Sequence, residues 1–200
     1  DLHMRQAPLT TVIQEAAQPH VDRGKMIHFE ETPELDAPSA MPSILRQPEI
    51  IHGLRNLVQN AVDFSRENVW VSSSWSDEKI TVRIMDDGRG YPAHLIGRIG
   101  DPFMPRRNTD RDRARRPEYE GMGLGLFIAK TLLERSGAQL AFHNRRRHGH
   151  ASWRGQATGG AVVEVVWPKE LLQSDTDWPS APLGENKPFA AKQFLNTHLL

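Results

Sequence analysis

The sequence contains no cysteine, so the 200 residues can form neither disulfide bonds nor thiolate metal sites. An excess of one charge is missing too, because 25 basic residues stand against 25 acidic ones. No overall field therefore attracts nucleic acid or an anionic membrane. No apolar run approaches the roughly 18 residues that cross a bilayer, and no signal peptide opens the chain. Because the chain begins with Asp1, we expect a piece of a longer protein whose membrane segments lie elsewhere.

The composition, with 38% hydrophobic and 25% charged residues, is that of one globular domain. We expect a linker remnant, the domain and a tail over residues 1–7, 8–168 and 169–200. Apolar residues at helical spacing predict helices over 8–17, 48–64 and 122–136. β-like patterns predict strands over 26–31, 69–75, 79–85, 139–143 and 161–167. Because these elements do not alternate regularly, the α+β class is expected.

Two asparagines share one face of the helix predicted over 48–64. Asn56 and Asn60 are four residues apart, so their side chains stack along the helix. Their carboxamides can offer oxygens to Mg²⁺ and N–H donors to phosphate. The alternative is a pair of asparagines that face solvent.

An acidic turn with two glycines follows the strand predicted over 79–85, and it reads DDGRG at 86–90. Asp86 can accept a hydrogen bond from an exocyclic amine. Gly88 and Gly90 let the backbone pass close beside a flat ring. An ordinary tight turn is the alternative, since Asp-Gly is a common turn dipeptide.

A glycine-rich segment, GMGLGL at 121–126, runs into the third predicted helix. Glycines there expose backbone N–H groups at the positive end of the helix dipole, which suits phosphate. Close helix packing is the alternative. The spacing fits neither a P-loop nor a dinucleotide-binding motif. DPF at 101–103 precedes an arginine-rich stretch through residue 120, which we expect to be mobile because it has little to bury.

Taken in order, these segments resemble the boxes of the ATP-binding domain of histidine kinases, the Bergerat or GHKL fold. The matching segments are LRNLVQNAVDF at 54–64, DDGRGYP at 86–92, DPF at 101–103 and GMGLGL at 121–126. The resemblance implies a two-layer α/β sandwich, with a mixed, mostly antiparallel sheet covered on one face by helices. It also implies a long ATP lid over about 101–122, and ATP and Mg²⁺ as cofactors.

The resemblance also implies roles for single residues. Asn60 would hold Mg²⁺ with Asn56 in support, and Asp86 would accept from the adenine amine. The glycines would form the floor of the site and the hinges of the lid, Phe103 would anchor the lid, and Arg106 or Arg107 would approach the γ-phosphate. The full nucleotide-binding set is Asn56, Asn60, Asp63, Asp86, Gly88, Gly90, Phe103, Gly121, Gly123, Leu124, Gly125 and Leu126.

Asp63 departs from the family pattern, because many histidine kinases carry a lysine at the matching position. It follows Asn60 by three residues and shares its face. We expect Asp63 to contact Mg²⁺ through water; the alternative is a solvated helix residue.

Two segments, NAVDFS and GMGLGLFIAKTLLERSGA, are similar in sequence to the RegB/PrrB (ActS-like) branch of redox-responsive sensor kinases. That similarity implies a cytoplasmic domain of an inner-membrane-anchored bacterial protein that passes phosphate to a response regulator. The phosphoacceptor would lie on an upstream dimerisation domain, and we expect this chain alone to be a monomer that binds no nucleic acid.

No histidine of this chain is assigned as phosphoacceptor, because none lies in the H-E/D-x-x-x-P setting of the family. The histidines are His3, His20, His28, His52, His94, His143, His148, His150 and His198. Two other functions stay open. A GHKL ATP hydrolase would carry a water-activating glutamate at position 56, where Asn56 is a poor general base. A catalytically silent regulatory module is the other.

Overall fold

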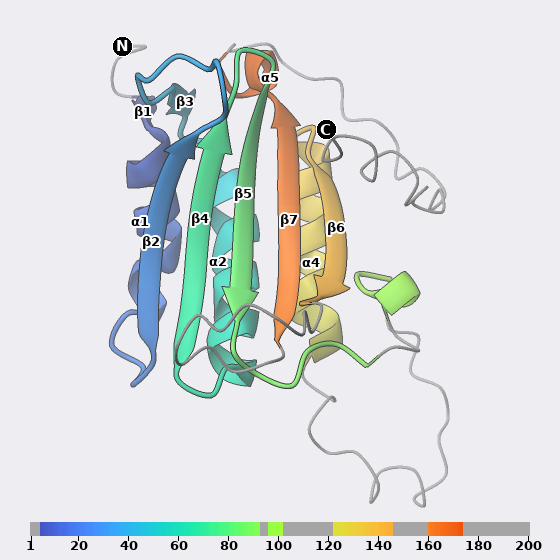
Figure 1. Ribbon diagram of the computed structural model, residues 1–200. Helices are drawn as coiled ribbons and strands as arrows, with labels where there is room; N and C mark the ends of the chain where they lie inside the picture. Colours follow the sequence, from blue (N-terminus) through green and yellow to red (C-terminus); the bar gives the residue numbers. More distant parts are fainter. Residues whose placement is uncertain (1–4, 93–95, 102–121, 146–159, 174–200) are drawn as a thin grey trace, which may run out of the picture.

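The computed structural model describes residues 5–92, 96–101, 122–145 and 160–173, and every structural statement below concerns these residues. Figure 1 shows a sheet with helices on one side. The elements in chain order are β1 (Gln6–Pro8), α1 (Leu9–Ala17), η2 (Gln18–His20), β2 (Met26–Pro33), β3 (Ser43–Leu45), α2 (Pro48–Phe64), β4 (Asn68–Trp75), β5 (Lys79–Asp86), η3 (Ile96–Arg98), α4 (Met122–Arg135), β6 (Gln139–Asn144), β7 (Ala161–Pro168) and α5 (Lys169–Gln173).

The main sheet has five strands in the order β2-β4-β5-β7-β6. β2 runs parallel to β4, and the other neighbours are antiparallel. Strands β1 and β3 form a separate antiparallel pair. Helices α1, α2 and α4 lie on the same face of the main sheet (Figure 1). The predicted α+β class and the helix-on-sheet layers are therefore confirmed.

Helix α2 lies at the centre of the helical layer because its sequence provides a continuous apolar stripe. Pro48 occupies its first turn, where a missing N–H costs nothing. Gly53 lets α4 approach, since an added Cβ would lie 2.5 Å from Leu133 Cγ. Burial of each large apolar side chain contributes about 1.5–3 kcal/mol. The buried residues of α2 are Ile50, Ile51, Gly53, Leu54, Leu57, Val58, Ala61 and Val62.

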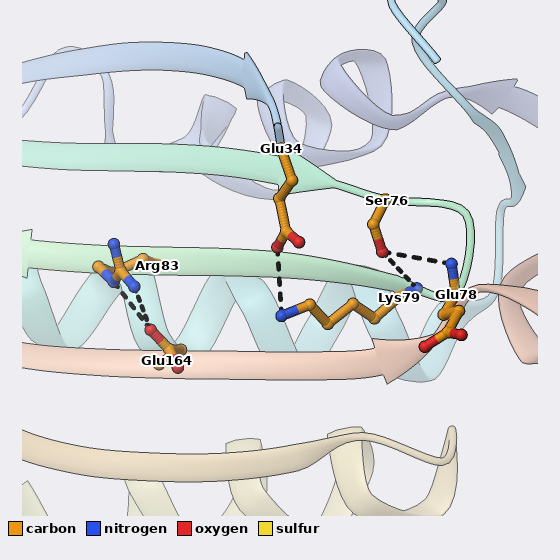
Figure 2. Close-up of polar contacts among 6 residues, drawn as sticks. All are labelled: Glu34, Ser76, Glu78, Lys79, Arg83 and Glu164. Carbon is orange, nitrogen blue, oxygen red and sulfur yellow. Dashed lines mark hydrogen bonds and ion pairs between the residues drawn. The ribbon is translucent and has the colours of Figure 1, made fainter. Parts of the chain in front are cut away.

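The two faces of the sheet differ in polarity because the strands alternate. Val69, Val71, Ser73 and Trp75 of β4 are buried, whereas the residues that alternate with them are half-buried. On the opposite face, Arg83 of β5 lies directly across from Glu164 of β7, and its Nε donates to Glu164 Oε2 at 2.9 Å. Figure 2 shows this pair beside the pair of Lys79 with Glu34, which marks this face as polar.

Five short elements were not predicted from the sequence, namely β1, β3, α5 and the 3-10 turns η2 and η3. They have five residues or fewer, too few for a periodic pattern. Ala7 pairs with Ile44, and Leu172 is fully buried, so the folded part includes residues on both sides of the expected limits at 8 and 168. The predicted division into linker, domain and tail stays a prediction. The lid interior over 102–121 and the tail after residue 173 lie outside the described residues.

Candidate functional site

Strand register brings Asp86 and the adjoining ends of β4, β6 and β7 to one end of the sheet. Asp86, the last residue of β5, pairs with Val69 at the start of β4. At the start of β7, Ala161 pairs with Asn144 at the end of β6. The C-terminal end of α2 and the N-terminal end of α4 lie at the same end of the molecule, which is the lower end in Figure 1.

Asp86 is a buried carboxylate held by backbone donors. Its Oδ1 accepts hydrogen bonds from the N–H of Gly88 at 2.8 Å and from the N–H of Ala161 at 3.2 Å. Among the described residues, no hydrogen bond reaches Oδ2. Burial raises the pKa of Asp86 above its ordinary value, although the two N–H groups counter part of this effect. The two backbone N–H groups therefore fix the direction of Oδ1, and no described donor occupies Oδ2.

Asp87 follows in sequence and has a different task that sequence reasoning missed. Its carboxylate accepts from the backbone N–H groups of Arg66, Glu67 and Asn68 and from the Asn68 side chain, at 2.7–3.2 Å. Burial acts to raise its pKa, but these donors more than offset that effect, so the pKa of Asp87 is lowered. Asp87 thus fixes the turn from α2 to β4, and Asp-Asp in one turn gives no sign of which residue does so.

The glycines beside Asp86 are required by space and backbone conformation. An added Cβ at Gly88 would lie 2.1 Å from the Phe64 carbonyl oxygen. At Gly160 it would lie 1.9 Å from the Asp86 carbonyl oxygen, and φ there is +135°. Gly90 has φ +80° and packs against Asn144. The sequence motifs had indicated Gly88 and Gly90, but not Gly160.

Asn144 ties the glycine turn to β6, a contact that no motif indicated. Its Oδ1 accepts from the N–H of Tyr91 at 2.6 Å, and its Nδ2 donates to the Tyr91 carbonyl at 2.7 Å. The Tyr91 ring is buried edge-on against Phe142. The turn that holds Asp86 is therefore braced by the end of β6.

The three polar residues predicted on α2 occupy one partly exposed face of the helix. Asn56 and Asn60 are half-buried and Asp63 is exposed. Asn56 Nδ2 donates to the His52 carbonyl at 3.0 Å, so its amide oxygen is turned away from the helix backbone. Asp63 Oδ1 accepts from Arg23 Nη2 at 2.7 Å. The water-mediated contact of Asp63 with Mg²⁺ stays a prediction.

The start of α4 carries the second glycine segment. An added Cβ at Gly125 would meet no heavy atom within 4 Å among the described residues, so helix packing does not explain this glycine. Leu126 is buried in the core, whereas Leu124 is 68% exposed. Leu126 therefore anchors the helix start and leaves its neighbours at the surface. Phe103 and Gly121, predicted in the same set, lie outside the described residues, as do Arg106 and Arg107.

Known proteins with similar sequences are histidine kinases. The family model of the histidine kinase-, DNA gyrase B- and HSP90-like ATPase matches residues 46–171. Sensor histidine kinase RegB of Cereibacter sphaeroides is 55% identical over 186 residues, which cover 93% of this chain and 40% of that protein. The putative sensor histidine kinase NtrY-like of Rickettsia bellii is 27% identical, over 62% of this chain and 17% of that protein. The chain thus spans about 40% of the length of the RegB relatives.

Solved structures show the same fold at lower sequence identity. The catalytic domain of histidine kinase ThkA aligns with a TM-score of 0.56 and 21% identity, over 82% of this chain and 95% of that chain. The mycobacterial sensor histidine kinase MprB aligns with a TM-score of 0.54 and 20% identity, over 82% and 97%. The ordered boxes, the helix-on-sheet architecture and these matches agree. The chain belongs to the family of histidine kinase-, DNA gyrase B- and HSP90-like ATPases, and its sequence is similar to that of sensor histidine kinase RegB.

Proposed function

We propose that the chain binds Mg-ATP at the end of the sheet that carries Asp86 and transfers the γ-phosphoryl group to a histidine. That histidine would lie on a dimerisation domain outside this chain, and the phosphate would then pass to an aspartate of a response regulator. The parent protein is anchored in the inner membrane, with this domain on the cytoplasmic side. The names of the RegB relatives support the reaction. No helix in the described part of the chain is long and apolar enough to cross a bilayer.

The arrangement of Asp86 carries the proposal. An ionised carboxylate only accepts hydrogen bonds, and its Oδ1 is already engaged by two backbone N–H groups. The remaining oxygen suits an exocyclic amine, such as that of adenine. Because the group is buried, a ligand without a donor there would leave Oδ2 unpaired, which costs about 1–3 kcal/mol. This cost favours adenine over a base that presents an acceptor at that place.

The residues on α2 fit a magnesium ion. Mg²⁺ takes oxygen ligands and keeps several waters, so one or two protein oxygens suffice. Asn60 would supply one amide oxygen and Asn56 a second, since the Asn56 nitrogen is engaged by the helix backbone. In the described residues no group of three or more His, Cys, Asp or Glu side chains forms an alternative metal site. When bound, Mg²⁺ neutralises charge on the phosphate oxygens.

The chain's own residues then orient the nucleotide, and the covalent demand on them is small. Phosphoryl transfer needs in-line positioning and neutralisation of charge rather than an acid or base of high power. Asp86 would fix the purine, and the backbone N–H groups at the start of α4 would meet the phosphates. Hydrolysis is the alternative fate of ATP. It needs a general base near the γ-phosphate, and Asn56 cannot accept a proton at neutral pH.

The experiment mixes the purified chain, radiolabelled Mg-ATP and a separate protein that contains the parent's phosphoacceptor helices. We expect acid-labile phosphate on the acceptor and little free phosphate. The matched variant Asp86→Asn keeps the size of the side chain and an oxygen for both N–H groups, but presents a donor to the adenine amine. It should lower ATP affinity about 10- to 100-fold. It should fold at least as well as wild type, because it removes a buried charge.

Each result decides between the functions. Free phosphate without acceptor labelling would identify a hydrolase, and nucleotide binding with neither product would identify a silent module. If the folded wild-type chain takes up no adenine nucleotide in excess Mg²⁺, the proposed function is wrong.

A further inference from the structure

The segment between η2 and β2 is fastened to the C-terminal end of α2. The Met26 N–H donates to the Glu67 carbonyl at 2.8 Å. Lys25 Nζ donates to the carbonyl of Ser65 at 3.2 Å and also to that of Arg66. These carbonyls lie just beyond the helix end, where the dipole favours a cation. The segment therefore has a fixed position beside the helix that carries the two asparagines.

Within this segment, Arg23 reaches the polar face of α2. Its Nη2 donates to Asp63 Oδ1 at 2.7 Å, and its Nη1 lies 3.4 Å from Nδ1 of His20. His20 is buried on η2, and burial followed by the charge of Arg23 lowers its pKa, so the neutral ring that accepts from Arg23 is favoured. Two contacts thus hold the guanidinium from two sides.

The charges of Asp63 and Arg23 bear on how this face of α2 could meet a triphosphate. Asp63 is three residues after Asn60, so the two side chains are neighbours on the helix surface. A lone carboxylate beside an ATP triphosphate would repel it. A guanidinium has five N–H donors in a planar fork that matches phosphate oxygens. Asp63 and His20 engage two of the donors of Arg23, so others remain for a ligand.

We propose that Arg23 is a phosphate-binding residue of the ATP site and that Asp63 positions it. The positive charge next to Asn60 then comes from the segment before β2, and not from α2 itself. Asp63 acts on the nucleotide through Arg23 rather than through Mg²⁺. The inference rests on the proposed function, because it requires ATP at this end of the sheet.

The test measures the affinities of the chain for ATP, ADP and adenosine, with Mg²⁺ and with a chelator. Arg23→Ala should weaken ATP binding roughly five- to tenfold and leave adenosine binding unchanged. The loss should persist without Mg²⁺. Arg46→Ala is the matched control, because Arg46 pairs with Glu15 at 2.5 Å with 43% and 36% exposed side chains, against 42% and 36% for Arg23 and Asp63. It should bind ATP like wild type.

Two double variants separate a phosphate contact from simple neutralisation of Asp63. Arg23→Ala with Asp63→Lys places a cation on α2 and should restore most of the ATP affinity. Arg23→Ala with Asp63→Asn removes both charges and should not. Asp63→Asn alone should weaken ATP binding less than Arg23→Ala, because Arg23 is still present but held by His20 only.

Three results would overturn the inference while leaving the proposed function intact. The first is ATP binding by Arg23→Ala equal to that of Arg46→Ala. The second is equal rescue by the Asn and Lys double variants, which would reduce Arg23 to a counter-charge. The third is an equal loss of adenosine and ATP affinity, which would indicate a structural role. Absence of ATP binding by the wild type would instead contradict the proposed function itself.

Discussion

The turn after β5 and the outer face of α2 meet at the same end of the sheet, yet they are built in different ways. In the turn, Asp86 and Asp87 are buried and receive backbone N–H donors. On α2, Asn56 and Asn60 are half-buried and Asp63 is exposed beside Arg23. A buried frame of backbone donors can fix a neutral purine edge before the ligand arrives. A hydrated face of movable side chains suits a metal and a charged triphosphate.

The comparison predicts that substitutions that disturb the backbone packed around Asp86 and Asp87 lower stability, and that substitutions on the outer face of α2 affect binding alone. The largest effect is expected for Gly160→Ala, because the new Cβ would overlap the Asp86 carbonyl and φ is +135°. We expect a loss of about 3–5 kcal/mol in the free energy of unfolding, measured by chemical denaturation. Gly97→Ala is the control, since its added Cβ meets nothing within 4 Å. Equal stability of the two variants would contradict the close contact of Gly160 with the Asp86 carbonyl.

The next effect is expected for Asp87→Ala, which removes the acceptor of the N–H groups at 66–68. At pH 7 we expect a loss of about 2–4 kcal/mol. Because its folded-state pKa lies below the ordinary 3.8, Asp87 contributes fully above that pH and loses its contribution as pH falls through the folded-state value. The free energies of unfolding of wild type and variant should therefore converge at acid pH. Chemical denaturation at several pH values measures this. Asp77→Ala, at an exposed position, should differ little from wild type at any pH.

The smallest effect on the fold is expected for Asn60→Ala, which tests the opposite side of the comparison. Stability should change by less than about 0.5 kcal/mol, because the side chain is not a core residue. The affinity for ATP in Mg²⁺ should fall to near the value measured with a chelator, by calorimetric titration. Gln59→Ala, the exposed neighbour on another face, should keep the Mg²⁺ effect. If Mg²⁺ raises the ATP affinity of Asn60→Ala as much as that of wild type, Asn60 does not bind the metal.

Local pattern was sufficient for most elements of the fold. Helix α2 has the predicted limits of 48 and 64, and β4 and β5 differ from their predicted limits by one residue at one end each. A long amphipathic helix and alternating strands repeat their signal over several turns or pairs, which makes them recognisable. The elements β3 and α5 are too short to repeat any signal, and they gain their order from packing against the rest of the chain.

The candidate site was predicted in part for the same reason. Asn56, Asn60 and Asp86 lie in segments whose residue types and spacing allowed a binding site, and the resemblance to histidine kinases implied their roles. Asn144 was not predicted, because it lies 53 residues from Tyr91, the residue it braces. Gly160 is 74 residues after the backbone it must accommodate. Spacing along one element carries no information about such partners.

The sequence by itself determined the family, the order of the boxes and which side chains share one helix face or one strand end. The shared faces follow from the fixed rise and twist of a helix and the alternation of a strand, whereas the family follows from the resemblance of the ordered boxes. Only the tertiary structure decided that Asp87, and not Asp86, fixes the turn into β4, and that Arg23 meets Asp63 across 40 residues. Such pairings depend on how separate elements pack. Burial and the donors that packing provides then shift the pKa of Asp86 upward and that of Asp87 downward.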